Sequence, residues 1–249
     1  MNKSTHSKCF VDTVKIGILG GIGPESTSEF YSKLISKLQK SGMIKNNTEF
    51  PQIVINSIPA PELIHDTITK EELQAYILGL KELDSFGVDF IVMVCNTIHL
   101  YYDQLQKEIK TPIVDLRIEV KRVLIESKIK NAFILATPST VKKGLYRFDC
   151  GNIIEPTKKE LANLSDAVFC FNKGDNKQKQ IDVVKNICEK HTRDFNLPVI
   201  LGCTEFAVML ENENIHKINT IDILVNATIK KAEALKQRKN YKLNNLIIK

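Results

Sequence analysis

The sequence predicts an α/β protein made of two similar lobes, each with a parallel sheet, and a ligand cleft between them. Short apolar runs alternate with segments of helical spacing along the chain, which is typical of βαβ units. The second half of the chain repeats the order of elements of the first. In both halves an apolar run, at 90–94 and at 198–201, leads into a cysteine followed by small polar residues.

The apolar run 14–19 predicts the first strand, and the glycines after it predict a tight turn. In the segment 70–86 leucine and isoleucine recur at steps of three and four, which predicts an amphipathic helix that ends at Gly87. The first half is therefore expected to contain strands at 14–19, 52–56, 90–94 and 113–114, and helices at 25–38 and 70–86.

The second half follows the same plan, since the run 131–136 opens into Thr137-Pro138-Ser139-Thr140 as the first strand opens into its glycines. We expect strands at 131–136, 153–154 and 198–201, and helices at 141–148, 158–169, 179–194 and 223–238. The last helix is expected to return to the first lobe. The predicted lobes are 1–115 with 223–249, and 116–222, and residues 1–13 form a loose tail.

Composition excludes several classes of protein. The 249 residues are 43% hydrophobic and 26% charged, which is ordinary for a soluble globular protein. The net charge of +6 is spread along the chain and there is no tryptophan, so we expect no nucleic-acid partner. No apolar run approaches the roughly 18 residues that span a bilayer, and residues 1–13 lack the apolar core of a secretory signal. We expect a cytoplasmic protein with no membrane partner.

The six cysteines have no paired spacing, so free thiols are expected, and neither a disulfide framework nor a structural zinc site. The loop Gly20-Gly21-Ile22-Gly23-Pro24 does not fit a nucleotide site. Ser26 occupies the third glycine position of the dinucleotide fingerprint, and no Gly-Lys-Ser/Thr follows. A turn that brings the backbone close to a small ligand explains these glycines better, which makes Gly21 a candidate binding residue.

Cys95 and Cys203 are the candidate catalytic residues. A thiolate is an effective base when its pKa is lowered, and backbone amides and a helix N-terminus at a strand-to-helix turn have that effect. One thiol in each lobe suits an acid and a base acting on opposite faces of one carbon. The alternative is that both cysteines are small buried apolar residues. His99, one helical turn after Cys95, either assists the thiol or only fixes the turn.

Three segments resemble the signatures of the aspartate/glutamate racemase family, within the Asp/Glu/hydantoin racemases: Gly20-Gly21-Ile22-Gly23-Pro24, Cys95-Asn96-Thr97-Ile98-His99 and Gly202-Cys203-Thr204-Glu205. The resemblance implies two pseudo-symmetric α/β domains, a homodimer, and a mechanism that uses neither pyridoxal phosphate nor metal. It implies that Cys95 and Cys203 exchange the Cα proton of aspartate, glutamate or a wider set of amino acids. It also assigns substrate-pocket positions to Asn96, Thr97, Ile98, Thr137 and Thr204.

The chain looks like the aspartate racemase branch, because Gly20 and Glu205 stand where glutamate racemases carry an aspartate and a histidine. Two basic residues typical of aspartate specificity are missing. Glu62 or a neighbour stands in place of an arginine, and Ala162 or Asn163 in place of a lysine, although Lys158 and Lys159 are near in sequence. The resemblance therefore leaves the substrate open.

Two other functions remain open at this point. A dicarboxylate cis–trans isomerase or a decarboxylase of the same superfamily would use the same cleft. Decarboxylases of this kind keep only the second cysteine, so Cys95 counts against them. The missing basic residues also allow a non-catalytic protein that binds an amino acid.

Overall fold

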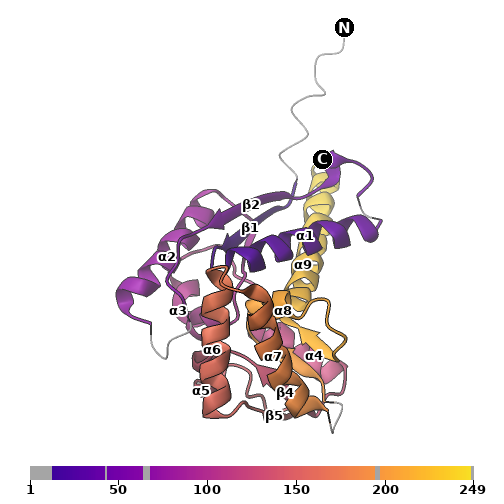
Figure 1. The fold of residues 1–249 in the computed structure, drawn as a ribbon. Helices are drawn as coiled ribbons and strands as arrows, with labels where there is room; N and C mark the ends of the chain where they lie inside the picture. The colour runs from indigo at the N-terminus through magenta and orange to yellow at the C-terminus, as the bar shows by residue number, and fades with distance from the viewer. Residues whose placement is uncertain (1–12, 43, 64–67, 194–196, 248–249) are drawn as a thin grey trace.

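The computed structural model describes residues 13–42, 44–63, 68–193 and 197–247, with side chains up to residue 241. The described chain forms two parallel sheets, one from each half (Figure 1). The first sheet has the order β2-β1-β3 and the second has the order β5-β4-β6-β7. Their strands are β1 (Lys15–Gly20), β2 (Gln52–Ser57), β3 (Phe90–Met93), β4 (Asn131–Leu135), β5 (Asn152–Ile154), β6 (Val199–Leu201) and β7 (Lys217–Asn219).

The two sheets have matching topology. A single parallel bridge from Ile91 to Ile113 extends the first sheet at the place that β7 takes in the second. The last residue of β3, Met93, pairs with Leu19 of β1, and the last residue of β6, Leu201, pairs with Leu135 of β4. The predicted α/β fold with two parallel sheets is confirmed. The predicted strand at 113–114 is reduced to this bridge.

Helices connect the strands, as parallel pairing requires. They are α1 (Pro24–Lys40), α2 (Lys70–Ser85), α3 (Tyr102–Lys107), α4 (Leu116–Glu126), α5 (Pro138–Lys142), α6 (Lys158–Asn172), α7 (Lys177–Thr192), α8 (Thr204–Met209) and α9 (Thr220–Ile247), with 3₁₀ turns η1 (Asn47–Glu49) and η2 (Thr97–Tyr101). Capping boxes start two of them, Thr69 with Glu72 at α2 and Thr157 with Glu160 at α6. None of the described helices is long and apolar enough to cross a membrane.

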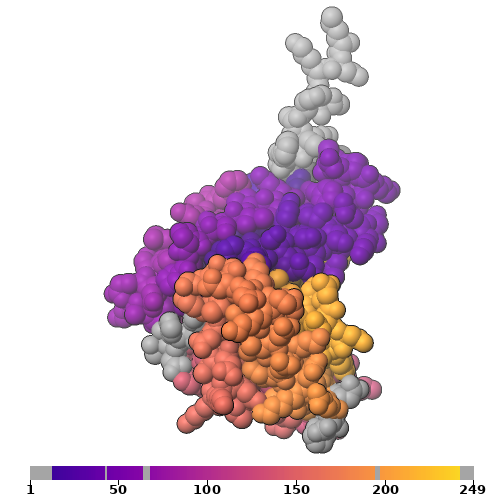
Figure 2. Space-filling model, viewed as in Figure 1, coloured from indigo at the N-terminus to yellow at the C-terminus, as the bar shows by residue number. Residues whose placement is uncertain are grey.

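The two halves share a core. One cluster of buried apolar side chains contains residues of both sheets, such as Ile16 and Phe90 from the first and Phe133 and Ile200 from the second. A second cluster lies between the first sheet and α2. The long α9 packs against α1 and α4, and Figure 1 shows it (yellow) passing behind α1. In Figure 2 the early part of the chain (violet) lies across the later part (orange).

Some predicted elements are wrong in detail. The helix predicted at 141–148 is instead the short α5, because Thr137 caps its start and Gly144, with φ +65°, follows its end. The final helix starts at Thr220 and is longer than predicted, and α4 was not predicted. The predicted tail lies outside the described residues except for Thr13, as does Asp194 at the end of the predicted helix 179–194.

Candidate active site

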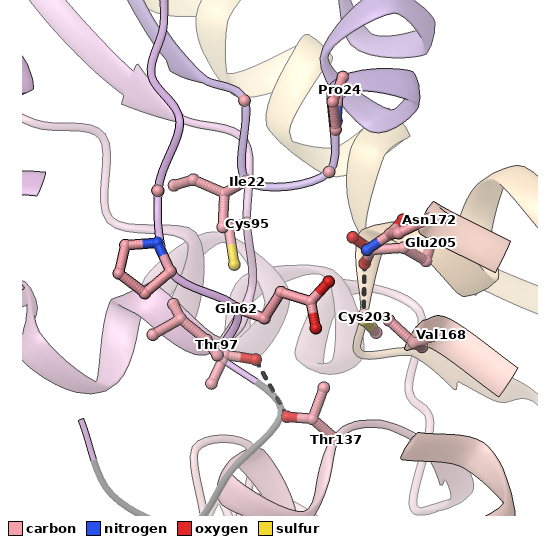
Figure 3. A pocket seen from close by; sticks show the side chains of 15 residues that line it. Ile22, Pro24, Glu62, Cys95, Thr97, Thr137, Val168, Asn172, Cys203 and Glu205 are labelled. Atoms are coloured by element: carbon pink, nitrogen blue, oxygen red, sulfur yellow. Dashed lines mark hydrogen bonds between the residues drawn. The ribbon is translucent and has the colours of Figure 1, made fainter. Parts of the chain in front are cut away.

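A cavity of about 210 Å³ lies at the carboxyl ends of the strands and is lined by residues of both halves of the chain (Figure 3). This is the edge at which open α/β sheets bind ligands. The lining residues are Gly21, Ile22, Gly23, Pro24, Ala60, Pro61, Glu62, Leu63, Cys95, Thr97, Thr137, Val168, Asn172, Cys203 and Glu205.

Cys95 and Cys203 both line this cavity, and both are buried free thiols. Cys95 lies two residues after Met93, the last residue of β3, and Cys203 lies two residues after Leu201, the last residue of β6. The matching registers therefore carry one sulfur to each side of a single cavity. The arrangement supplies two groups that can hold a proton on opposite sides of a bound carbon.

Both thiols are protonated at neutral pH. Burial raises the pKa of Cys95 from 9.0 to about 12, although the backbone amides of Thr97 and Ile98 lower it in part. Burial, followed by the nearby Glu205 carboxylate, raises the pKa of Cys203 well above 9.0. The expectation of pKa values lowered by the turn amides is wrong for the unliganded protein, because desolvation outweighs the amide dipoles.

Glu205 is the polar partner of Cys203. The Cys203 thiol donates a hydrogen bond of 2.8 Å to Oε2 of Glu205, and the Thr204 hydroxyl lies 3.3 Å from the same oxygen. Glu205 is buried in the first turn of α8 and also lines the cavity. From the sequence, Glu205 stood out only because glutamate racemases carry a histidine at this position. Its spacing, two residues after the cysteine at a helix start, was the available signal for this contact.

The glycine loop brings the first half of the chain against Glu205. At Gly23, with φ +83°, an added Cβ would lie 2.3 Å from Oε1 of Glu205. At Gly21, with φ +82°, an added Cβ would lie 2.2 Å from the carbonyl oxygen of Ile58. Thr27 braces the loop, since its hydroxyl accepts from the Gly21 amide at 3.0 Å. These glycines permit a close approach of the Glu205 carboxylate and of the backbone at Ile58. The predicted approach of a small ligand to this turn stays a prediction.

A threonine cluster joins the two halves at the cavity. The Thr97 hydroxyl lies 3.0 Å from the hydroxyls of both Thr137 and Thr140, and all three residues are buried. Thr137 is also the N-cap of α5. Thr97 and Thr137 line the cavity, and their hydroxyls bond to each other and to Thr140 there.

Asn96, Ile98 and Thr204 do not line the cavity. Ile98 packs fully buried in the core under α2, although its amide faces the Cys95 sulfur. Asn96 Nδ2 donates to Thr220 Oγ1 at 3.0 Å, and Thr220 Oγ1 donates to the carbonyl of Leu201 at 2.6 Å. Asn96 Oδ1 also accepts from the Tyr146 hydroxyl. These bonds tie the turn after β3 to the end of β6, so Asn96 sets the spacing of the two cysteine turns.

His99 does not contact the thiol. Its Nδ1 lies 2.8 Å from the Cys95 carbonyl oxygen and its Nε2 lies 3.4 Å from the Val114 carbonyl oxygen. The ring is fully buried, and burial lowers its pKa. A neutral imidazole that donates to a backbone carbonyl holds the turn in place. Of the two roles considered for His99, assisting the thiol or fixing the turn, the contacts support the second.

Of the described residues at or near the two positions expected to be basic, none brings a cation to the cavity lining. Ala162 and Asn163 are exposed on α6 and do not line it. Lys158 and Lys159 are in the first turn of α6, whereas Val168 and Asn172 at its other end line the cavity. Lys159 is roughly 14 Å from Val168 along the axis at 1.5 Å per residue. The sequence held no signal for Asn172, because its place depends on how α6 packs.

Among the described residues, no group of three or more His, Cys, Asp or Glu side chains is arranged to hold a metal ion.

Proteins of known sequence resemble parts of the chain. The broad specificity amino-acid racemase RacX of Bacillus subtilis (strain 168) is 35% identical over 133 residues, which are 53% of this chain and 58% of that protein. The glutamate racemase of Aquifex pyrophilus is 44% identical over 64 residues, which are 24% of this chain and 25% of that protein. The chain thus spans at most little more than half of these relatives.

Solved structures resemble the fold over most of its length. The aspartate racemase of Picrophilus torridus superposes with a TM-score of 0.73 at 26% identity, covering 88% of this chain and 94% of that one. An aspartate racemase homologue from Pyrococcus horikoshii OT3 gives 0.63 at 25% identity, covering 88% and 99%. The model of the Asp/Glu/hydantoin racemase family matches residues 19–228. With that match over most of its length, the chain belongs to the Asp/Glu/hydantoin racemase family.

Proposed function

We propose that this chain is an amino-acid racemase that exchanges the Cα proton of its substrate between Cys95 and Cys203. The observation that carries the proposal is the presence of both thiols, at matching strand ends, in one cavity. Family membership supports the reaction class, as do relatives named as amino-acid, aspartate and glutamate racemases.

The reaction needs one thiolate and one thiol. Glu205 makes Cys203 the thiol that loses its proton first, because its Oε2 already accepts the hydrogen bond of the Cys203 thiol at 2.8 Å. When the proton moves to Glu205, the Cys203 thiolate can remove the Cα proton of the substrate. The substrate ammonium group favours this step, since its positive charge offsets the buried negative charge.

Cys95 then donates its proton to the opposite face of the planar carbanion, which inverts the configuration. Its pKa of about 12 keeps it protonated until this step. The reaction leaves a Cys95 thiolate, a Cys203 thiol and a protonated Glu205. The Cys95 thiolate can then remove the Cα proton of the other enantiomer, while Cys203 donates its proton and takes one back from Glu205, which restores the resting state.

The carbanion is the unstable species, and its charge spreads onto the α-carboxylate. Thr97 and Thr137 offer hydroxyls in the cavity wall, and the amides at Thr97, Ile98 and Glu205 point toward the sulfurs. Oriented donors in a cavity with little water stabilise such a charge strongly. We infer that the α-carboxylate binds against these donors, with Cα between the two sulfurs.

The test is Cα deuterium incorporation from heavy water, followed by proton NMR for the L and D forms of the common amino acids. The wild type should exchange and interconvert the enantiomers of at least one of them. Cys95→Ala and Cys203→Ala should each abolish racemisation. Cys188→Ala is the matched control, because Cys188 is equally buried but lies in the core away from the cavity. It should keep wild-type turnover.

Near-wild-type turnover in either cavity variant would disprove the two-thiol mechanism. Absence of exchange in the wild type, with turnover of maleate-like or malonate-like acids, would indicate an isomerase or decarboxylase instead. Thermal stabilisation by an amino acid with no exchange would indicate a binding protein.

A further inference from the structure

The Tyr146 side chain is buried in the core that the two sheets share, and its hydroxyl donates a hydrogen bond to Oδ1 of Asn96. Asn96 is the residue after Cys95, so this bond reaches from the second half of the chain to the first cysteine turn. Burial raises the pKa of Tyr146 well above 10.0, and the charges of Cys95 and Cys203 add to this effect. The hydroxyl therefore lies within electrostatic reach of both sulfurs, behind the wall of the cavity.

This hydrogen bond is the first of three in series. Asn96 Nδ2 donates to Thr220 Oγ1 at 3.0 Å, and Thr220 Oγ1 donates to the carbonyl of Leu201 at 2.6 Å. Leu201 is the last residue of β6, two positions before Cys203. The side chains of Tyr146, Asn96 and Thr220 are all buried. The series thus begins behind the Cys95 turn and ends at the strand that leads to Cys203.

Each bond of the series has only one possible direction. A carbonyl oxygen only accepts, so the single hydroxyl proton of Thr220 goes to Leu201. Toward Asn96, Thr220 can then only accept, which places the amide nitrogen on that side and the amide oxygen on the side of Tyr146. A reversed amide would set two acceptors against each other at Thr220 and leave buried groups unpaired. The Tyr146 hydroxyl is the donor that the required orientation of the amide needs.

The segment that carries Tyr146 also holds the next residue of the same turn. The Thr97 hydroxyl lies 3.0 Å from the hydroxyls of Thr137 and Thr140. The Leu145 amide, next to Tyr146, donates to the Thr140 carbonyl at 3.1 Å, which fixes the phenol relative to these threonines. The threonines therefore hold one residue of the cysteine turn, and the phenol orients the residue before it.

From this series of bonds we propose that Tyr146 is a positioning residue for the racemisation, whose hydroxyl fixes the Asn96 amide and so sets the separation of the Cys95 and Cys203 sulfurs. The inference rests on the racemase function proposed above. Tyr146 does not serve as an acid in the reaction, because its proton is donated to Asn96. Both sulfurs must reach one carbon, and a displacement of about 1 Å can slow such a reaction about 100-fold.

The first experiment compares Tyr146→Phe with the wild type, using the amino acid that the wild type exchanges fastest. Phenylalanine keeps the ring in the core and removes only the hydroxyl, so Asn96 loses its donor. We expect kcat for racemisation to fall by about 10- to 100-fold, and KM to change by less than about 3-fold because the cavity lining is retained. Tyr102→Phe is the matched control, since the Tyr102 hydroxyl donates to the Ile113 carbonyl at 3.2 Å. It should keep the wild-type kcat.

A second readout separates positioning from a loss of stability. In heavy water, protonation of the carbanion by the opposite thiol gives the other enantiomer. Protonation from the first side returns the starting enantiomer, which carries deuterium when the first thiol has exchanged with solvent. In Tyr146→Phe the ratio of deuterated starting enantiomer to inverted product should rise above the wild-type ratio, as measured by chiral chromatography and mass spectrometry at early times. A variant that is only less stable would form less of both and keep the ratio.

The third experiment tests whether the series acts as a unit. If Tyr146 and Thr220 act through the same Asn96 amide, the double variant Tyr146→Phe/Thr220→Val should lose less kcat than the product of the two single losses. Tyr146→Phe combined with Thr228→Val is the control. The Thr228 hydroxyl donates to the Leu224 carbonyl within α9, so the losses in that pair should multiply.

The outcomes separate this proposal from the one on which it rests. Wild-type kcat in Tyr146→Phe, an unchanged ratio of the two products, or losses that multiply in the Thr220 pair would each overturn the positioning role while the racemase stands. If the wild type exchanges no amino acid, the racemase proposal fails, and unfolding free energies of the same variants test the bond series by itself. The losses of Tyr146→Phe and Thr220→Val should then be less than additive, and additive losses would overturn it.

Discussion

The Cys203 thiol and the Glu205 carboxylate form a hydrogen bond of 2.8 Å at the start of α8. The contact makes two otherwise matching sites unequal. At the corresponding turn after β3, the Cys95 sulfur faces the amides of Ile98 and Thr97, and Glu205 acts on it only through its charge. A thiol beside a carboxylate can lose its proton to it, whereas a thiol beside amides cannot. The two turns therefore match in topology, while only the Cys203 sulfur is hydrogen-bonded to a carboxylate.

Glu205→Gln should lower kcat for Cα exchange by about 10²- to 10⁴-fold, the usual contribution of a positioned general base. The amide keeps the shape of the side chain but cannot accept the thiol proton as a base. Steady-state exchange of the preferred amino acid measures the effect. Glu126→Gln, an exposed residue paired with Arg122 at the end of α4, is the control.

The same variant has a second readout that a purely structural role would not change. The Glu205 charge is one cause of the raised Cys203 pKa, so its removal should let Cys203 react with iodoacetamide at lower pH. Unchanged alkylation together with kcat within a few-fold of wild type would count against the assigned role.

Gly23→Ala should lower both stability and activity. The substitution combines a positive φ of +83° with a Cβ 2.3 Å from the Glu205 carboxylate. Gly87→Ala is a matched control, since Gly87 has a φ of +74° but no atom within 4 Å of the added Cβ. It should show only backbone strain, about 1 kcal/mol. Urea unfolding and exchange rates together compare the two. Equal effects on exchange would show that the approach of Glu205 to the glycine loop is unimportant.

Stability should fall at alkaline pH because of the buried thiols. The Cys95 pKa is about 12 in the folded protein, while in the unfolded chain the thiol titrates near its ordinary value of about 8.5. Below that value the thiol is protonated in both states and its contribution is fully present. As pH rises toward 12 the unfolded chain ionises first, so the free energy of unfolding falls by at most about 1.4 kcal/mol per pH unit.

Urea unfolding of Cys95→Ala from neutral to alkaline pH should therefore show a shallower decline than the wild type. Cys188→Ala should remove a smaller part of the decline, because the pKa of Cys188 is raised only to about 11. A wild-type decline that neither substitution reduces would mean that these thiols ionise in the folded protein at their ordinary pH.

Thr220→Val should destabilise the protein and slow exchange. The Thr220 hydroxyl accepts from Asn96 at 3.0 Å and donates to the Leu201 carbonyl at 2.6 Å, so it connects the two cysteine turns. Leaving these buried groups without partners costs about 1–3 kcal/mol. Thr228→Val is the control, because that equally buried hydroxyl only donates to Leu224 within the same helix.

The comparison needs both unfolding free energies and exchange rates. Thr220→Val should lose activity even under conditions where it is fully folded, since the sulfur spacing changes. Loss of activity in both variants to the same degree would assign the effect to α9 packing alone.

The strand and helix order and the two-sheet fold were predictable because apolar periodicity and glycine turns are local signals. The helix predicted at 141–148 was wrong. The apolar residues that suggested it continue beyond Gly144, but α5 ends before this glycine, which has a φ of +65°. Family membership was predictable from three short motifs, two of which carry the cysteines. The limits of the lobes stay a prediction, since α9 packs against both α1 and α4 and one core joins the sheets.

The sequence by itself determined the fold class, the family and the two thiols. Each strand end and the cysteine turn that follows it are adjacent in the sequence, so a local pattern identifies them. Only the tertiary structure decided the chemistry around those thiols. Their raised pKa values depend on burial by distant residues. The contact of Gly23 with Glu205, the place of Glu62 in the cavity and the distance of Lys158 and Lys159 from it depend on how separate segments pack. Local patterns do not encode such distances, since desolvation and charge act through space.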